Sequence, residues 1–418
     1  MNENRLRRLA QWAKTNATEC IFPFWTSEYI MDQENGGFYG VVTLDMQRNN
    51  SEPRGLTLTG RMLYAFSTAY RVFGDDIYRQ RAAYTFHELV TRFYDPEYGG
   101  AFTTVTEKGE VLTTDKPNYC EAFLIMGCAA YYHATGDTEA LRIAMETFHI
   151  METKVKYAPA CYHGNMTRDF QVADGFGFGR KGSKSPFPPD AIVFPHHLCQ
   201  AYLRLYQATG DPEVGAALRD MVCAVVSSLY DAQYHCFKTI MAKDGSRIGT
   251  NQSFGHDCEI SYLAVNAARL VGEKDLQDKV SAVVTDVLYH VLENDFDPYG
   301  GLYNGGDLLT GEKSPQSHVW WAQAEGVSAM LCGYALTGDE RFLKACEMQA
   351  DFIDKYFVNR EHGDWYNNIL VDETGGHIVD GMHGFDKLNP GKCPFHNSQM
   401  CFEVMERTAA LLKQEESL

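Results

Sequence analysis

The feature that most constrains the fold of this chain is an internal repeat. Five amphipathic segments each end at a glycine that is followed by an acidic residue, and successive glycines lie 62, 74, 62 and 66 residues apart. A glycine directly after a helical pattern is typical of a helix C-cap, and the acidic residue is typical of a new helix start. The five glycines are Gly74, Gly136, Gly210, Gly272 and Gly338.

A second repeated signal is a glycine turn between aromatic residues. It occurs as ENGGFYG at Gly36, EYGGAF at Gly99 and PYGGLY at Gly300, with the variant EHGDWY at Gly363. The first two turns are 63 residues apart, and so are the last two. Paired glycines between alternating aromatic residues predict tight hairpins that join short strands.

A repeat unit that holds two helices predicts a repeat architecture, and roughly six such pairs fit the length of the chain. An open solenoid needs atypical polar end repeats, and none is evident. We therefore predict an all-α fold, an (α/α)6 barrel with short β-hairpins in the loops on one face. An open α-solenoid that binds other proteins is the alternative. The segment richest in Gly, Pro and Ser, residues 176–189, is short enough to be a long loop, so residues 1–418 are predicted to form a single domain.

Composition narrows the class of function. The net charge of −18 argues against nucleic acid or an anionic membrane as a partner. The N-terminal segment MNENRLRRLAQWAKTN lacks the apolar core of a signal peptide, and no stretch approaches the length of a membrane span. The twelve cysteines are then expected to be reduced thiols. We expect a cytoplasmic monomer or homodimer whose partner is a small molecule.

The first candidate for chemistry is the segment SFGHDCEISYL. His256 and Glu259 lie three residues apart and therefore on one face of the predicted helix. A carboxylate beside an imidazole fixes its tautomer and raises its basicity, which suits a general base. A surface His–Glu pair is the alternative, and so is a metal site, which would need a third ligand from elsewhere.

Other candidates lie early in other predicted helices. Trp321 and Glu325 are i, i+4 neighbours, an aromatic ring beside a carboxylate of the kind that binds sugars. Arg61 lies in an otherwise apolar helix, where it needs an acidic partner or an oxygen-rich ligand. His396 precedes an amphipathic helix and is a candidate second base.

The segment PHHLCQAYLRLY carries two further histidines, of which we expect only one to face the centre of the barrel. That residue is His197 rather than His196. Taken alone, each of these candidates would more often be a residue packed in the protein core than a residue of an active site. Together they occupy the beginnings of different helices, and a closed barrel would bring them to one end of one cavity.

These residues resemble the N-acylglucosamine 2-epimerase family, and more closely its cellobiose 2-epimerase and mannose-isomerase-like branches. The resemblance runs nearly from end to end. The specific motifs are FGHDCEISYL and GKCPFHNSQMCFEV, supported by GRMLYAFSTAYRVFG, YHGNMTRDFQ, HVWWAQAEGV and GDWYNN.

The resemblance implies a sugar 2-epimerase or isomerase that transfers a proton at C2 of a reducing aldose through an enediolate, without a cofactor and without a metal. It implies that His256 and His396 are the acid/base pair, that Glu259 orients His256, and that Arg61 stabilises the enediolate. His197 would assist ring opening. The expected substrate-binding residues are His197, Trp321, Glu325, Tyr119 and Tyr262.

Three positions depart from the cellobiose 2-epimerase pattern. The family's Asn ahead of the inner-helix histidine corresponds to Val193, and a Trp corresponds to Tyr262. A Trp that would stack on a second sugar ring is replaced by Asn389, Pro390 and Gly391. A monosaccharide such as mannose is therefore at least as good a candidate as cellobiose.

Three other outcomes stay open. Protonation of the enediolate at C1 would give an aldose–ketose isomerase that converts mannose to fructose. A glycoside hydrolase on the same barrel would use Glu259 and Glu325 as its two carboxylates. A sugar-binding protein or scaffold would leave the inward histidines unused. Residues 181–189 are the candidate lid.

Overall fold

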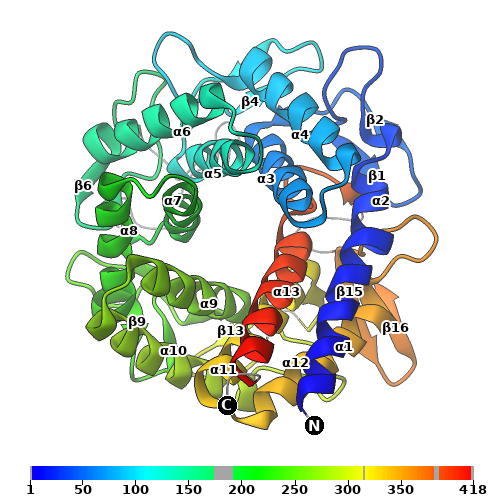
Figure 1. Cartoon of the computed structure of the whole chain (residues 1–418), viewed down its shortest axis with the longest axis vertical. Helices are drawn as coiled ribbons and strands as arrows, with labels where there is room; N and C mark the ends of the chain where they lie inside the picture. The colour runs from blue at the N-terminus through cyan, green and yellow to red at the C-terminus, as the bar shows by residue number, and fades with distance from the viewer. Residues whose placement is uncertain (1, 174–191, 314–315, 381–385, 416–418) are drawn as a thin grey trace.

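The chain folds into two concentric rings of helices, an inner ring inside an outer ring (Figure 1). The computed structural model describes residues 2–173, 192–313, 316–380 and 386–415. The inner helices are α3 (Leu56–Phe73), α5 (Asn118–Thr135), α7 (His196–Thr209), α9 (Phe254–Val271), α11 (Trp320–Thr337) and α13 (Phe395–Glu415). The outer helices are α1 (Asn2–Thr15), α4 (Asp76–Glu88), α6 (Thr138–Ile150), α8 (Pro212–Ala224), α10 (Lys274–Asn294) and α12 (Glu340–Phe352).

The ring closes through its first and last helices. The outer helix α1 packs along α13, the last inner helix, and α13 also packs against α3. The two chain ends consequently lie near each other in Figure 1. This closure confirms the predicted (α/α)6 barrel and contradicts the open solenoid.

The glycine signals have the predicted structural role. All five repeat glycines follow the last residue of an inner helix in the left-handed conformation, with φ between 65° and 83°. Their amides bond back to the helix four residues earlier, as in Gly74 N–H to Tyr70 C=O. An aspartate then caps the next outer helix in three units, for example Asp137 with the amides of Glu139 and Ala140.

Several outer helices end in a wider π-helical turn before the chain enters a hairpin. These turns are η1 (Asn16–Ile21), η3 (Leu89–Phe93), η4 (Met151–Val155), η5 (Val225–Leu229) and η6 (Ile353–Phe357). The remaining short helical segments are α2 (Phe22–Trp25) and η2 (Glu28–Ile30). After the turn the glycine hairpins form, closed by bridges such as Met31 to Phe38 and Tyr94 to Ala101.

Short antiparallel strands lead into the beginnings of the inner helices. The strand β3, for instance, runs directly into α3, and β14 runs directly into α11. The hairpins therefore build the face of the barrel at which the inner helices start, as predicted. The strands are β1 (Val41–Thr43), β2 (Arg48–Asn49), β3 (Arg54–Gly55), β4 (Thr104–Val105), β5 (Val111–Thr113), β6 (Lys156–Ala158), β7 (Cys161–Tyr162), β8 (Ile192–Val193), β9 (Tyr230–Asp231), β10 (Cys236–Phe237), β11 (Ile240–Met241), β12 (Asn251–Ser253), β13 (Gly305–Asp307), β14 (His318–Val319), β15 (Asn368–Asp372), β16 (Gly375–Ile378) and β17 (Asp386–Leu388).

An ion pair ties the hairpins to the inner helices in five of the units. In each, an aspartate at a hairpin meets a cation on the segment before the next inner helix. The pairs are Asp32–Arg54, Asp95–Lys116, Asp231–Arg247, Asp295–Lys313 and Asp364–Lys392. The sequence patterns did not predict this repeated contact.

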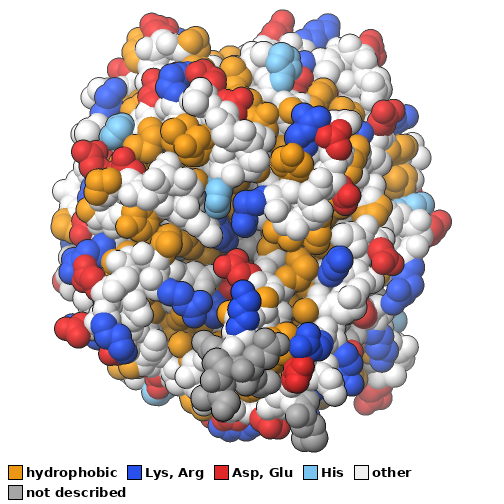
Figure 2. All heavy atoms as spheres, viewed as in Figure 1, with side chains coloured by type: hydrophobic (Ala, Val, Ile, Leu, Met, Phe, Trp, Pro, Cys, Tyr) orange, Lys and Arg blue, Asp and Glu red, His pale blue; other side chains and the backbone are white. Residues whose placement is uncertain are grey.

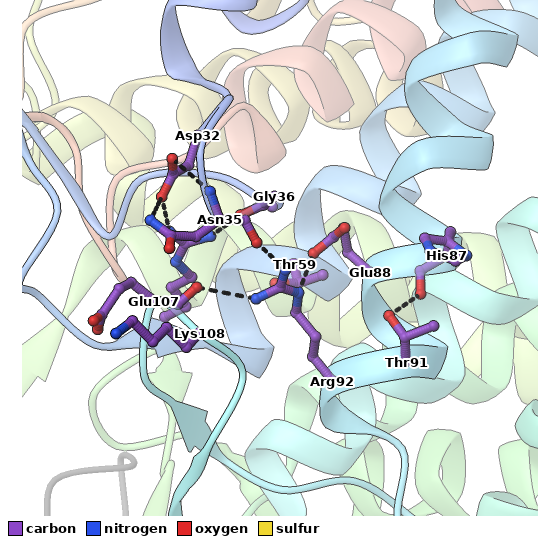
Figure 3. A network of polar contacts seen from close by, with 12 residues as sticks. Asp32, Asn35, Gly36, Thr59, His87, Glu88, Thr91, Arg92, Glu107 and Lys108 are labelled. Atoms are coloured by element: carbon purple, nitrogen blue, oxygen red, sulfur yellow. Dashed lines mark hydrogen bonds and ion pairs between the residues drawn. The ribbon is translucent and has the colours of Figure 1, made fainter.

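Figure 3 shows the surroundings of the first hairpin. Arg92 forms an ion pair with Glu88 on the same helical segment. Its guanidinium also donates to the carbonyl of Asn35 and, at 3.0 Å, to that of Glu107. Glycine is favoured at position 36 because its backbone has a φ of 78°, in the left-handed region that other residues rarely adopt.

The Asp95–Lys116 pair allows a prediction about stability. Burial alone would raise the pKa of Asp95, but its hydrogen bonds to Arg168 and Lys116 outweigh burial and lower the pKa to about 2. Asp95→Asn leaves the fully buried Lys116 without its anion, so the free energy of unfolding should fall by about 3–5 kcal/mol at neutral pH.

The sign of the pH dependence follows from the lowered pKa. The stabilisation is complete above the unfolded-state pKa of about 4 and is lost as the pH falls towards 2. Urea unfolding should therefore show the gap between wild type and Asp95→Asn narrowing below about pH 4. Asp76→Asn, which breaks an exposed pair with Arg79, is the control. An equal effect of both variants would contradict the prediction.

On the face drawn in Figure 2, acidic and basic side chains are interspersed, and no large area carries charges of one sign only. All twelve cysteines are free thiols, and most are buried in the helical layers. Among the described residues, no helix has the length and apolar character needed to cross a bilayer.

Candidate active site

The candidate residues converge at one end of the barrel, as predicted from their positions. Each lies within the first two turns of its inner helix. Arg61 lies on α3, Tyr119 on α5, His197 on α7, His256 and Glu259 on α9, Trp321 and Glu325 on α11, and His396 on α13.

His256 is oriented by a residue other than the one predicted. Its Nδ1 atom lies 2.8 Å from Ser253 Oγ, one turn earlier in the chain. When Nδ1 donates to this hydroxyl, Nε2 carries the lone pair and is free to accept a proton. Burial in the barrel lowers the pKa of His256 to about 4, so the imidazole is neutral at neutral pH.

The expected contact between Glu259 and His256 is therefore wrong. Both carboxylate oxygens of Glu259 are buried without a hydrogen-bond partner among the described residues. Glu259 lies instead 3.8 Å from His196 Nε2 and 3.8 Å from His197 Nδ1. The i, i+3 spacing puts Glu259 and His256 on one face, but the ring of His256 turns back towards Ser253.

His396 contacts the carboxyl group of Glu325, a residue predicted from the sequence to bind the sugar. Its Nδ1 atom lies 2.6 Å from Glu325 Oε1, and the two residues are separated by 71 positions in the chain. Glu325 was predicted to bind the sugar, but its first contact is with this imidazole. The helices α11 and α13 pack side by side in the inner ring, which explains how the two groups meet.

Trp321 contacts both imidazoles. Its ring centroid is 5.0 Å from that of His256 and 5.6 Å from that of His396. Gly255 permits this arrangement, because a Cβ atom there would lie 2.5 Å from the indole. The imidazoles of His256 and His396 therefore contact the same aromatic ring.

Arg61 is a buried charge that lacks an ion-pair partner in the described part of the chain. One Nη atom donates to the Tyr119 hydroxyl at 2.8 Å, and the other lies 3.5 Å from the carbonyl of Gly391. The guanidinium lies over the rings of Phe123 and Phe395, with centroid distances of 4.3 and 5.0 Å. The alternative of a Glu partner within ion-pair distance is contradicted for the described residues, although Arg61 and Glu259 are close enough for the charge of each to affect the pKa of the other.

His196 was predicted to face away from the site, and this prediction is wrong. Its ring centroid is 4.1 Å from that of His197 and 4.8 Å from that of His256. Both of its ring nitrogens are buried without a hydrogen-bond partner among the described residues. His196 is the first residue of α7, and at this position helical periodicity does not decide the direction of the side chain.

The electrostatics of the site combine several neutral imidazoles with buried carboxyl groups. Burial lowers the pKa values of His196 and His197 well below the usual value. Burial also raises the pKa values of Glu259 and Glu325, and the charge of Glu259 raises that of Glu325 further. Protonation of at least one of the two carboxyl groups is therefore favoured over full ionisation of both.

Tyr119 and Tyr262 differ in position. Tyr119 contacts Arg61 and packs edge-on against the ring of His197, so it belongs to the wall of the site. Tyr262 was predicted to bind substrate, but its ring is fully buried and its hydroxyl accepts a hydrogen bond from Gln399 at 2.6 Å. Tyr262 therefore contacts Glu325 and Gln399 within the core of the barrel. The candidate lid, residues 181–189, lies outside the described residues.

Comparison with known proteins identifies related chains. A family model for N-acylglucosamine 2-epimerase matches residues 37–384. A cellobiose 2-epimerase from Ruminococcus albus is 30% identical over 392 residues, which cover 93% of this chain and 96% of that protein. The solved structure of cellobiose 2-epimerase from Bacillus thermoamylovorans has a TM-score of 0.86 at 27% identity and covers 96% of this chain and 100% of its own. A D-mannose isomerase structure, with a TM-score of 0.77 at 20% identity over 95% of this chain and 97% of its own, shares the fold.

Proposed function

The chain belongs to the N-acylglucosamine 2-epimerase family, and from this premise we propose that its barrel transfers a proton at C2 of a reducing aldose. It is an enzyme of the carbohydrate epimerase and isomerase class. The observation that carries the proposal is the placement of two imidazoles, His256 and His396, against the same indole of Trp321.

In the proposed reaction, one imidazole removes the C2 proton of the open-chain aldose. The electron pair of the C–H bond forms the C1–C2 double bond, and the carbonyl π electrons move to O1 to give an enediolate. The other imidazole returns a proton to C2 on the opposite face, which inverts that carbon. Reprotonation at C1 would instead give a ketose from the same intermediate.

Arg61 provides the stabilisation that makes the first step feasible. The C2 hydrogen is too weakly acidic for a neutral imidazole unless the developing charge on the enediolate is stabilised in a site that excludes water. The guanidinium is buried, and no carboxylate among the described residues lies within ion-pair distance. We assign it to the oxygens at C1 and C2.

Ring opening precedes this step, because reducing sugars are mainly cyclic. We assign it to His197 and Glu259, whose Nδ1 and Oε1 atoms lie 3.8 Å apart. Burial raises the pKa of Glu259 to the point where it can carry a proton at neutral pH. Protonation of the ring oxygen and removal of the anomeric hydroxyl proton need one acid and one base of this kind.

Two carboxylates are also present, as a hydrolase would require. Glu259 and Glu325 lie near each other and near a His396 nitrogen. Glu325 is moreover engaged by His396. This geometry favours proton transfer over glycosidic cleavage.

The experiment that tests the proposal is a substrate panel with product identification. Purified protein should be incubated separately with mannose, glucose, N-acetylglucosamine and cellobiose, and the products separated by chromatography. We expect the C2 epimer of at least one of the four. Fructose from mannose would assign the isomerase outcome, and release of glucose from cellobiose would contradict the proposal.

Glu325 is proposed as the positioning residue of His396. Glu325→Gln keeps an oxygen that can accept from Nδ1 but removes the carboxyl group that would pair with the protonated imidazole, so kcat should fall roughly 10- to 100-fold, as expected for loss of a charge-assisted hydrogen bond. The acidic limb of the kcat/KM profile should move to lower pH, because a carboxylate no longer stabilises the protonated imidazole.

A purely structural role for Glu325 would not move that limb. Gln349→Leu is a matched control, since Gln349 is buried on the outer helix α12 and its side chain bonds Gln323 rather than a residue in contact with a candidate base. If both variants change kcat equally with no change in the pH profile, the assignment of Glu325 is wrong.

A further inference from the structure

The face of α9 that carries His256 and Glu259 meets a third potential metal ligand from another helix. A His-x-x-Glu pair supplies only two ligands for a metal ion, and the sequence offered no third within a compact spacing. The structure places His196, the first residue of α7, beside this pair.

The geometry of the three side chains suits a small cation. One ligand atom from each of His196, His256 and Glu259 lies within 4.8 Å of the others. His196 Nε2 and Glu259 Oε2 are 3.8 Å apart. Ligands at about 2.0–2.2 Å from a tetrahedral zinc ion lie roughly 3.3–3.5 Å from one another, so modest side-chain movements would complete the shell.

A second observation shows that the ligand atoms are available. The carboxylate of Glu259 is completely buried, and neither of its oxygens has a hydrogen-bond partner among the described residues. Both ring nitrogens of His196 are likewise buried without a hydrogen-bond partner among the described residues. A buried carboxyl group without a hydrogen-bond partner is costly in either protonation state, and coordination of a cation by the deprotonated group would remove that cost.

The third ligand already has the orientation of a metal-bound histidine. Ser253 Oγ contacts His256 Nδ1, which leaves Nε2 for the metal. Ligating histidines usually make such a hydrogen bond through the other ring nitrogen. The neighbouring group of Glu259, Glu325 and His396 is less suitable, because Glu325 and His396 already bind each other at 2.6 Å.

We propose that His196, His256 and Glu259 form a binding site for a divalent transition-metal ion such as Zn²⁺, and that the bound ion inhibits the enzyme. Two imidazoles and one carboxylate are ligands preferred by Zn²⁺, Co²⁺ and Ni²⁺ rather than by Mg²⁺ or Ca²⁺. A metal on Nε2 of His256 occupies the lone pair that would remove the C2 proton. The inhibition, although not the binding, rests on the function proposed above.

The test begins with binding and needs no substrate. Chelator-treated protein is dialysed against ZnCl₂, and bound zinc is measured by elemental analysis. We expect one tightly bound Zn²⁺ per chain in the wild type and affinities at least about 100-fold weaker in His196→Ala and Glu259→Gln. Thermal unfolding of each variant without metal verifies that it is folded.

The matched control is His235→Ala. His235 is exposed and contacts Asp286 of the outer helix α10 at 2.8 Å, so its loss should leave the tight site intact. Equal binding by wild type and both site variants, or loss of the tight site in His235→Ala, would overturn the proposal.

Turnover separates this inference from the proposed function. In an active preparation, Zn²⁺ should lower kcat for the sugar, because the blocked base is needed to remove the C2 proton, and Mg²⁺ at the same concentration should not. Tight zinc binding without turnover of any tested sugar would support the metal site and count against the epimerase. Turnover without tight zinc binding would overturn the metal site alone.

Discussion

Replacing His256 with Gln is expected to lower the rate of epimerisation on the order of 10³-fold, which is within the range that a general base contributes. Gln retains much of the shape of the side chain but cannot accept and return a proton. His256 and His396 both contact the indole of Trp321, and the substitution removes only one of these two bases.

This two-base arrangement makes a sharper prediction than loss of activity. His396 should still remove the C2 proton from one of the two epimers and return a proton to the same face. His256→Gln should therefore exchange deuterium into one epimer without inverting it, and His396→Gln should do so with the other epimer. The measurement is the C2 proton signal of each epimer in deuterated water.

A control distinguishes chemistry from damage to the fold. His149 lies exposed on the outer helix α6, and His149→Gln should keep full activity. Equal loss of exchange from both epimers in His256→Gln, with the thermal midpoint unchanged, would contradict the two-base assignment.

Replacing Arg61 with Met is expected to lower kcat roughly 10²- to 10³-fold, the size of effect seen when one donor to a developing oxyanion is removed. The side chain is buried over Phe123 and Phe395, so Met fills a similar apolar space. Steady-state kinetics with the preferred sugar measure this loss.

The thermal stability of Arg61→Met, unlike its kcat, should not fall below that of the wild type. In the described part of the chain Arg61 has no ion-pair partner, and removing a buried charge without a partner relieves a desolvation cost. Arg61→Met should therefore unfold at an equal or higher temperature than the wild type. Arg61→Lys keeps the charge without the planar fork and should recover part of kcat. A lower thermal midpoint in Arg61→Met would indicate a structural role instead.

The architecture was predictable because its signals are local and repeated. A glycine such as Gly74 ends a helix through the conformation of its own backbone, and the paired turn at Gly99 closes a hairpin within a few residues. The five helix-ending glycines showed that a pair of helices repeats along the chain, and about six such pairs predicted a closed ring. The end of the barrel that holds the site followed from the positions of the candidates early in their helices.

The partners within the site depended on contacts between distant segments. Glu325 meets His396 because α11 packs beside α13, and no local pattern encodes that pairing. The inward position of His196, and the absence of a hydrogen-bond partner for Glu259 among the described residues, likewise depend on how distant segments pack. The Ser253–His256 contact was different, because a hydroxyl three residues before a histidine at a helix start was a readable signal that went unused.

The central claim is that a proton moves at C2, and the most direct test is a proton NMR time course of the wild-type enzyme with mannose, glucose and cellobiose in deuterated water. The account predicts that the C2 epimer forms with deuterium at C2, since the abstracted proton exchanges with solvent on an imidazole. An epimer that keeps its original hydrogen at C2, or glucose released from cellobiose with no deuterium at C2, would contradict it.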